Sequence, residues 1–206
     1  MSHYFENDAS LKSKVVKTTS VINGMDFEFY TDNGVFSKRG LDFGTRTLLE
    51  TLDMNKISGS VLDFGCGYGP IGIYIAKFEQ NKVHMIDVNR RSLELARKNV
   101  DLNHVNVSLY ESDIYSNVTC KFDYIISNPP IRVGKEILYK ILFGAKDYLK
   151  KNGELWIVVH KDQGAKSLVK DLMNSYGKVE VVTKNKGFYV IRSVNNWQFA
   201  IVLVKL

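Results

Sequence analysis

The sequence predicts an α/β fold built on a doubly wound, mostly parallel, seven-stranded sheet. Short apolar runs alternate with segments of helical periodicity between residues 60 and 176. This alternation is typical of parallel strands covered by helices on both faces and joined by right-handed crossovers. The strand-like runs after residue 176 have no helix between them, which predicts an antiparallel edge at the carboxyl-terminal end.

A short β-hairpin is expected before the alternating region. Residues 14–31 place Asn23-Gly24 between two segments of partly alternating polarity, which is the strongest short-range signal for a hairpin turn. Leucines near helical spacing then predict a helix over 40–54. We expect residues 1–34 to form a hairpin extension and residues 35–206 to form one domain.

The remaining elements follow from short apolar runs and from stripes of apolar residues. The expected strands are VLDF (61–64), KVHMID (82–87), VSLY (107–110), FDYIIS (122–127), ELWIVVH (154–160), KVEVVT (178–183), FYVIRSV (188–194) and WQFAIVLV (197–204). Helices are expected over 71–78, after a cap at Asn89, from about 138 to a stop at Asn152-Gly153, and over 168–176.

The composition fits a soluble protein of 206 residues, with 45% hydrophobic and 24% charged residues. No apolar run approaches the roughly 20 residues that cross a bilayer, and no signal peptide is evident, so we expect a cytoplasmic protein without a membrane partner. Two cysteines and four scattered histidines predict a reducing compartment and no metal site. The net charge of +6 favours a polyanionic partner.

A glycine-rich loop, DFGCGYGPIG (63–72), follows the first strand of the alternating region. In open α/β sheets ligands bind beyond the carboxyl ends of strands, and glycines there allow a ligand to approach the backbone. Asp87 closes the next strand 20 residues after Gly67, where a carboxylate can accept both hydroxyls of an adenosine ribose. The loop and Asp87 together indicate a nucleoside cofactor.

The glycine-rich loop is compatible with two kinds of cofactor. Gly67, Gly69 and Gly72 satisfy the dinucleotide spacing G-x-G-x-x-G, which is a weak signal by itself. Asp63 places a negative charge before the loop, which suits the amino group of S-adenosylmethionine better than a pyrophosphate. No obvious acid or base for hydride transfer follows. We therefore expect S-adenosylmethionine, with a nicotinamide-dependent oxidoreductase as an alternative.

Two adjacent prolines end the strand at 122–127. Pro129 and Pro130 have no N–H and fix φ near about −65°, so the strand stops at Ser127. Asn128 precedes a proline and is held extended. If Asn128 Oδ1 and the Pro129 carbonyl each accept an N–H from an exocyclic amine, they orient its lone pair at a sulfonium methyl. Such positioning can remove about 7–11 kcal/mol of a barrier.

In their combined order these motifs resemble the class I S-adenosylmethionine-dependent methyltransferases that modify planar nitrogens. The resemblance covers roughly residues 35–193 and includes D-x-G-x-G-x-G (63–69), Asp87, SD (112–113) and NPP (128–130). GVFSKRGLDFGTRTLL, SNPPIRVGK and QGAKSL further resemble the small-subunit (16S) rRNA guanine-N2 methyltransferases (RsmC-like) and their compact single-domain relatives. This implies a Rossmann-like fold and methyl transfer to an exocyclic amine of RNA, above all guanine N2 of 16S rRNA.

The resemblance also implies site residues and partners. The implied catalytic residues are Asn128, Pro129, Pro130 and Ile131. The implied cofactor-binding residues are Phe36, Asp42, Thr45, Asp63, Gly65, Cys66, Gly67, Gly69, Asp87, Val88, Asp113, Ile114 and Asn128. The implied partner is ribosomal RNA or the small ribosomal subunit, bound by a monomer or a homodimer.

The target and its contacts stay open at this stage. Related Asn-Pro-Pro enzymes usually carry an aromatic residue next, whereas this chain has Ile131; an aliphatic contact, or an aromatic such as Phe36 or Tyr189, would replace the stacking. Adenine N6 and a protein glutamine are alternative targets, and a non-catalytic RNA-binding module is a third possibility. The lysines of residues 12–17 and the basic stretch 132–151 are candidates to hold RNA. The apolar tail either completes the sheet or covers a partner subunit.

Overall fold

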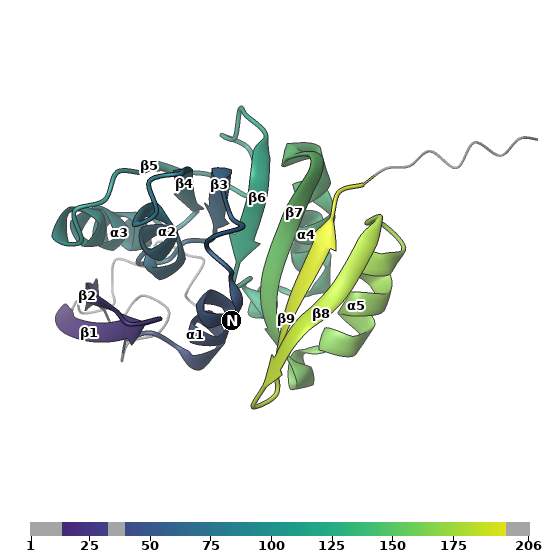
Figure 1. Ribbon diagram of the computed structural model, residues 1–206, viewed down its shortest axis with the longest axis horizontal. Coiled ribbons are helices and arrows are strands. Elements are labelled where there is room, and N and C mark those ends of the chain that lie inside the picture. The colour runs from purple at the N-terminus through teal and green to yellow at the C-terminus, as the bar shows by residue number, and fades with distance from the viewer. Residues whose placement is uncertain (1–13, 33–39, 197–206) are drawn as a thin grey trace, which may run out of the picture.

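A seven-stranded sheet with helices on both faces forms the centre of the computed structural model, which describes residues 14–32 and 40–196 (Figure 1). The strands are β1 (Val16–Ile22), β2 (Met25–Thr31), β3 (Gly59–Phe64), β4 (Asn81–Asp87), β5 (Ser108–Glu111), β6 (Phe122–Ser127), β7 (Leu149–His160), β8 (Lys178–Asn185) and β9 (Phe188–Val194). The helices are α1 (Phe43–Thr51), α2 (Pro70–Ala76), α3 (Arg90–Leu102), α4 (Lys135–Tyr148) and α5 (Ala165–Met173), with short 3-10 turns at Ile131–Val133 and Lys161–Gln163.

The sheet has the strand order β5-β4-β3-β6-β7-β9-β8. Strands β3 to β7 pair in parallel, whereas β9 pairs antiparallel with both β7 and β8. The predicted seven-stranded sheet with an antiparallel edge is therefore confirmed. Because β4 and β6 lie on opposite sides of β3, the strand order switches direction there, and ligands of open α/β sheets bind at the carboxyl ends beside such a switch.

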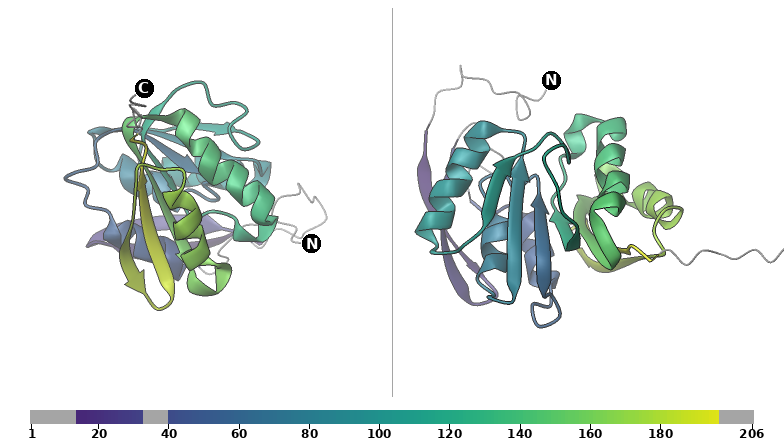
Figure 2. Two further views of the ribbon diagram at one scale, coloured as in Figure 1. Left: turned by 90° about the vertical axis from the view of Figure 1, so that its right-hand side faces the viewer. Right: turned by 90° about the horizontal axis from the view of Figure 1, so that it is seen from above.

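Successive side chains along each central strand pack in two separate hydrophobic clusters, one on each face of the sheet. Val61 and Ile126 pack on the face covered by α1, α2 and α3, while their chain neighbours Leu62 and Ile125 pack on the face covered by α4 and α5. The period-two geometry of a strand causes this division. Figure 2 shows α4 and α5, the green helices, side by side over their face of the sheet.

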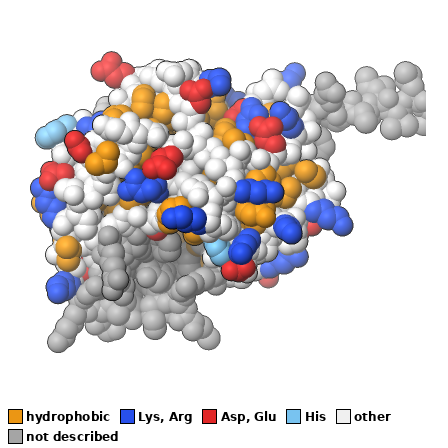
Figure 3. All heavy atoms as spheres, turned by 60° about the horizontal axis from the view of Figure 1, so that its bottom comes forward, with side chains coloured by type: hydrophobic (Ala, Val, Ile, Leu, Met, Phe, Trp, Pro, Cys, Tyr) orange, Lys and Arg blue, Asp and Glu red, His pale blue; other side chains and the backbone are white. Residues whose placement is uncertain are grey.

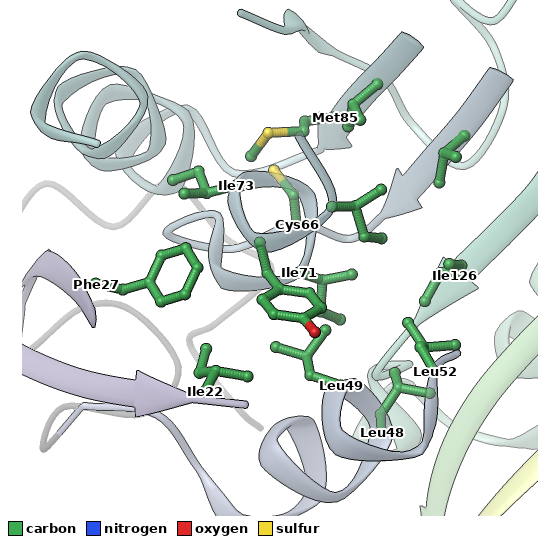
Figure 4. Close-up of a cluster of buried hydrophobic side chains, with 14 of the residues drawn as sticks. Ile22, Phe27, Leu48, Leu49, Leu52, Cys66, Ile71, Ile73, Met85 and Ile126 are labelled. Atoms are coloured by element: carbon green, nitrogen blue, oxygen red, sulfur yellow. The ribbon is translucent and has the colours of Figure 1, made fainter. Parts of the chain in front are cut away.

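The hairpin β1–β2 is part of the first cluster. Its turn residues Asn23 and Gly24 both have positive φ (47° and 77°), as a tight hairpin turn requires. Ile22 and Phe27 are buried and point toward side chains of α1 and α2 (Figure 4). The Asn99 amide of α3 holds β2 by pairing with the N–H and carbonyl of Tyr30 at 2.6 and 2.9 Å. The division of the chain at residue 34 falls in the segment 33–39, outside the described residues, and stays a prediction.

The predicted helix stop at Asn152-Gly153 is wrong. Helix α4 ends at Tyr148, and β7 begins at Leu149, which pairs with Phe122 of β6. Asn152 donates its N–H to the Asn195 carbonyl at 3.0 Å, and Gly153 accepts from Asn195 at 2.8 Å. These long-range backbone bonds replace the local bonds of a helix end.

Two other expectations concern the ends and the membrane. The strand predicted over 197–204 lies outside the described residues. In the part of the chain that is described, none of the helices has both the length and the apolar character needed to traverse a bilayer.

Candidate active site

The glycine loop after β3 combines an open side with a packed side. Gly65, Gly67 and Gly69 all have positive φ (67°, 57° and 99°), which an L side chain rarely adopts. A Cβ added at Gly65 or Gly67 would meet no atom within 4 Å. A Cβ at Gly69 or Gly72 would instead lie 2.8 or 2.5 Å from the Met85 side chain. The first two glycines therefore leave room for a ligand, and the last two allow the loop to pack on β4.

Asp63, at the base of this loop, is a fully buried acidic side chain, and one of its two oxygens has no hydrogen-bond partner among the described residues. Its Oδ2 accepts the Gly72 N–H at 2.8 Å, whereas Oδ1 has no hydrogen-bond partner among the described residues. Burial raises the pKa of Asp63 to about 8, and the nearby Asp87 carboxylate also contributes to this rise. A buried acceptor without a partner costs free energy unless a ligand satisfies it. Asp63 Oδ1 therefore fits a cationic donor such as an ammonium group.

Asp87 links the end of β4 to the same loop. Its Oδ2 accepts the Gly67 N–H at 2.9 Å and its Oδ1 accepts the Asn89 N–H at 2.8 Å. Burial raises the pKa of this carboxyl group as well. Each carboxylate oxygen has a second lone pair, so Asp87 can still accept from the hydroxyls of a ribose. Asn89 caps α3, as predicted, by accepting the Ser92 N–H at 3.1 Å.

The loop after β5 contains a strained residue. Ile114 has φ of 50°, which is unfavourable for a β-branched side chain. The buried Ser112 holds this conformation, because its hydroxyl donates to the Ile114 carbonyl at 3.1 Å and accepts the Asn117 N–H at 3.2 Å. Asp113 between them is exposed. Strain of this kind persists only where the surroundings impose it, and such residues cluster at ligand sites.

Asn128 lies at the tip of β6 with its amide held by α1. Its Nδ2 donates to Asp42 Oδ1 at 3.3 Å and to Thr45 Oγ1 at 3.0 Å. Asp42 also caps α1 by accepting the Thr45 N–H at 3.0 Å. An ionised carboxylate accepts hydrogen bonds only, so Asp42 fixes which end of the amide faces it. Asn128 Oδ1 accepts no hydrogen bond from the described residues and is left for a ligand.

The residues around Asn128 anchor the turn. The Ser127 hydroxyl donates to the Phe64 carbonyl at 2.8 Å and joins the ends of β6 and β3. Pro130, with φ of −74°, begins the 3-10 turn that follows. Ile131 is half-buried and packs against the cluster under α4 and α5.

Cys66, in the middle of the glycine loop, has a structural environment. The side chain is buried, and burial raises the pKa of its thiol well above the usual value. Its N–H donates to the Ile86 carbonyl at 2.8 Å, which attaches the loop to β4. The thiol is therefore protonated and inert at neutral pH.

The model of the methyltransferase small domain family matches residues 26–192 of this chain. The chain belongs to this family. Among its relatives, the uncharacterized protein YbxB of Bacillus subtilis is 43% identical over 195 residues, which cover 93% of this chain and 97% of that protein. Ribosomal RNA small subunit methyltransferase C of Haemophilus influenzae is 40% identical over 172 residues, covering 81% of this chain and 51% of the relative.

Solved methyltransferase structures share the fold. The 16S rRNA N2 G1207 methyltransferase RsmC of T. thermophilus, described in complex with AdoMet and guanosine, matches with a TM-score of 0.79 and 23% identity over 89% of this chain and 51% of that one. A methyltransferase from Pyrococcus furiosus matches with a TM-score of 0.61 and 25% identity over 73% of this chain and 81% of the other. The chain spans about half the length of the methyltransferase C relatives that it matches.

The methyltransferase fold brings most of the predicted site residues to one edge of the sheet. Asp87 is hydrogen-bonded to Gly67, Asp63 to Gly72 of the same loop, and Asn128 to Asp42. The predicted cofactor residue at position 36 lies outside the described residues. Val88 is half-buried beside Asp87.

The sequence did not reveal that Asp42 and Thr45 hold the Asn128 amide. The sequence did contain a signal for the cap, because the spacing of Asp42 and Thr45 is the usual signature of a helix N-cap. It contained no signal for Asn128, which lies 83 to 86 residues away. The contact of Phe43 with Phe188 of β9 was also missed, because no local pattern joins these segments.

Proposed function

We propose that this methyltransferase transfers a methyl group from S-adenosylmethionine to an exocyclic amine of RNA, specifically guanine N2 of small-subunit ribosomal RNA. The observation that carries the proposal is the Asn128 amide, whose Nδ2 is fixed by Asp42 and Thr45 while Oδ1 is left to accept. The names of the methyltransferase C relatives and of the RsmC structure support the choice of RNA and of guanine.

The residues of the site fit S-adenosylmethionine. The unpaired Asp63 Oδ1 suits its ammonium group, and Asp87 suits the two ribose hydroxyls. Gly65 and Gly67 leave open space for the ligand to approach the loop backbone. The strained Ile114 and its neighbour Asp113 are proposed to border the adenine. When bound, the cofactor supplies a methyl group on a positively charged sulfur.

The protein contributes orientation rather than proton transfer. Asn128 Oδ1 and the Pro129 carbonyl each accept an N–H of the target amine, which directs the amine lone pair at the methyl group. As the amine gains positive charge, each of these hydrogen bonds strengthens toward the roughly 1.5–3 kcal/mol of a charged pair. No strong base is required, because the amine loses its extra proton to water after methylation. A paired guanine must first leave its stack, at a cost of a few kcal/mol.

The test is transfer of labelled methyl from S-adenosylmethionine to small ribosomal subunits, naked rRNA, transfer RNA and protein extract. Wild type is compared with Asn128→Ala and with Asn106→Ala, an exposed asparagine outside the site. We expect N2-methylguanine in rRNA, a loss of at least tenfold in rate for Asn128→Ala, and no change for Asn106→Ala. Label in adenine or in protein glutamine would overturn the guanine assignment, and equal rates for the three proteins would overturn the role of Asn128.

A further inference from the structure

A cluster of aromatic rings lies directly beside the Asn128 turn. Phe43 follows Asp42, the residue that holds Asn128. Its ring centroid is 5.8 Å from that of Phe188, at the start of β9, and Phe188 is 4.8 Å from the His160 ring at the end of β7. The contact is close, since a Cβ added at Gly44 would meet Phe188 at 2.8 Å. Three segments far apart in the sequence thus form one surface at the carboxyl edge of the sheet.

Two lysines lie beside these rings. Lys186 Nζ lies 5.1 Å from the Phe43 ring centroid. Lys161 is adjacent, because its N–H donates to the carbonyl of Gly187 in the β8–β9 turn at 2.7 Å. We call Lys161 and Lys186 with Phe43 and Phe188 the β8–β9 basic surface.

The charge of this surface is uncompensated within the described part of the chain. Lys161 and Lys186 are exposed, and neither of them forms an ion pair with a described residue. Two carboxylates lie close by: that of Asp162 is 3.4 Å from His160 Nδ1 and 74% exposed, and Asp42 Oδ1 would lie 3.2 Å from a Cβ added at Gly44. Figure 3 brings this edge of the sheet forward and shows blue basic side chains interleaved with orange apolar ones on the right, the side of β8 and β9.

We propose that the β8–β9 basic surface binds the RNA strand that flanks the target nucleotide, with the lysines on phosphates and the rings of Phe43 and Phe188 against a neighbouring base. The inference rests on the proposed RNA substrate and goes beyond it, because it assigns the RNA contacts to the end of β7, the β8–β9 turn, the start of β9 and the start of α1. Basic side chains interleaved with aromatic rings suit single-stranded RNA. The cations bind its phosphates, and its unstacked bases stack on the flat rings.

The experiment measures binding of a short fluorescein-labelled single-stranded RNA by anisotropy at several salt concentrations, using the full chain. The test variant is Lys161→Gln/Lys186→Gln. The control, Lys82→Gln/Lys98→Gln, removes the same charge from exposed positions on other elements. Binding of S-adenosylhomocysteine is measured for every protein as a check on folding.

Two phosphate contacts predict that the test variant lowers the slope of log affinity against log salt by about 1.4 and lowers affinity about 25-fold at 0.1 M salt. The control variant should keep most of the slope. Phe43→Leu, which retains bulk but removes the flat ring, should weaken binding about tenfold and leave the slope unchanged.

The outcomes separate this inference from the proposed function. If wild type methylates RNA while the test and control variants bind RNA equally, the surface assignment is wrong and the function stands. If the test variant loses binding but wild type transfers no methyl to RNA, the surface stands and the function is wrong. Wild type that binds S-adenosylhomocysteine but no RNA would overturn both.

Discussion

The raised pKa of Asp63 predicts that cofactor binding depends on pH. Burial holds this pKa at about 8 in the free protein, whereas the proposed ammonium contact to Oδ1 requires the carboxylate. Binding must therefore remove a proton from Asp63 below pH 8. The ligand of choice is S-adenosylhomocysteine, because it has the same amino group as S-adenosylmethionine and no sulfonium charge.

The size of the effect follows from two titrations. At pH 6, a group with a pKa of about 8 is ionised in about 1% of molecules, while an α-amino group with a pKa of about 7.7–8.0 is almost fully cationic. At pH 8 each group is in its required form in about half of the molecules, so that the product of the two fractions rises from about 0.01 to about 0.2. We expect S-adenosylhomocysteine to bind about 20-fold more tightly at pH 8 than at pH 6, and binding to weaken again above pH 8.

The assay is calorimetry at pH 6, 7, 8 and 9 in buffers with different heats of ionisation, which reports both affinity and protons released. Methylthioadenosine keeps the ribose and lacks the amino group, so its affinity should be flat over pH 6–8. Asp63→Asn should remove the pH dependence of S-adenosylhomocysteine binding in the same range. Equal pH profiles for the two ligands, or a slope that survives in Asp63→Asn, would refute the assignment of Asp63 Oδ1 to the ammonium group.

The same titration affects stability. Since the folded state holds a proton that the unfolded chain releases above about pH 4, the free energy of unfolding of the free protein should fall as pH rises from 4 to about 8. Saturating S-adenosylhomocysteine should reduce this fall in the free energy of unfolding. Thermal unfolding at each pH, with and without the ligand, measures the difference.

Further substitutions test the site and the packing. Asp42→Asn keeps the helix cap but removes the charge that fixes the Asn128 amide, so kcat should fall about fivefold, and a lower S-adenosylhomocysteine affinity would add the cofactor contact that the family resemblance implies; an unchanged kcat would exclude Asp42 from positioning Asn128. Phe27→Ala should lower the free energy of unfolding in urea by about 3–5 kcal/mol, against about 0.5 kcal/mol or less for the exposed Val21→Ala; a small effect would mean that the hairpin is not part of the core. Gly67→Ala should cost about 1–2 kcal/mol of stability because φ is positive there, and weaken S-adenosylhomocysteine more than tenfold, as a methyl group fills the open side of the loop; unchanged affinity would exclude that side as the binding site.

The sequence by itself determined the order of the elements and the class of the sheet. The burial of strand side chains leaves a clear pattern of apolar residues in the sequence. The strands predicted at FDYIIS and FYVIRSV therefore have the same bounds as the observed β6 and β9. The prolines after Ser127 and the glycines after Phe64 dictate backbone conformation through their own covalent structure, which is why the loop and the turn were also predictable. The end of α4 was not, because long-range bonds between the 152–153 segment and Asn195 decide it.

Tertiary structure alone decided how the parts of the site meet. The contact of Asn128 with Asp42, the unpaired state of Asp63 Oδ1, and the grouping of Phe43 with Phe188 all join residues that share no local pattern. Local patterns report the burial and conformation of each segment, whereas the neighbours of a side chain depend on the order and register of strands. The sequence therefore identified the residues at the carboxyl edge of the sheet, and the fold determined which hydrogen bonds remain for ligands and where the basic surface lies.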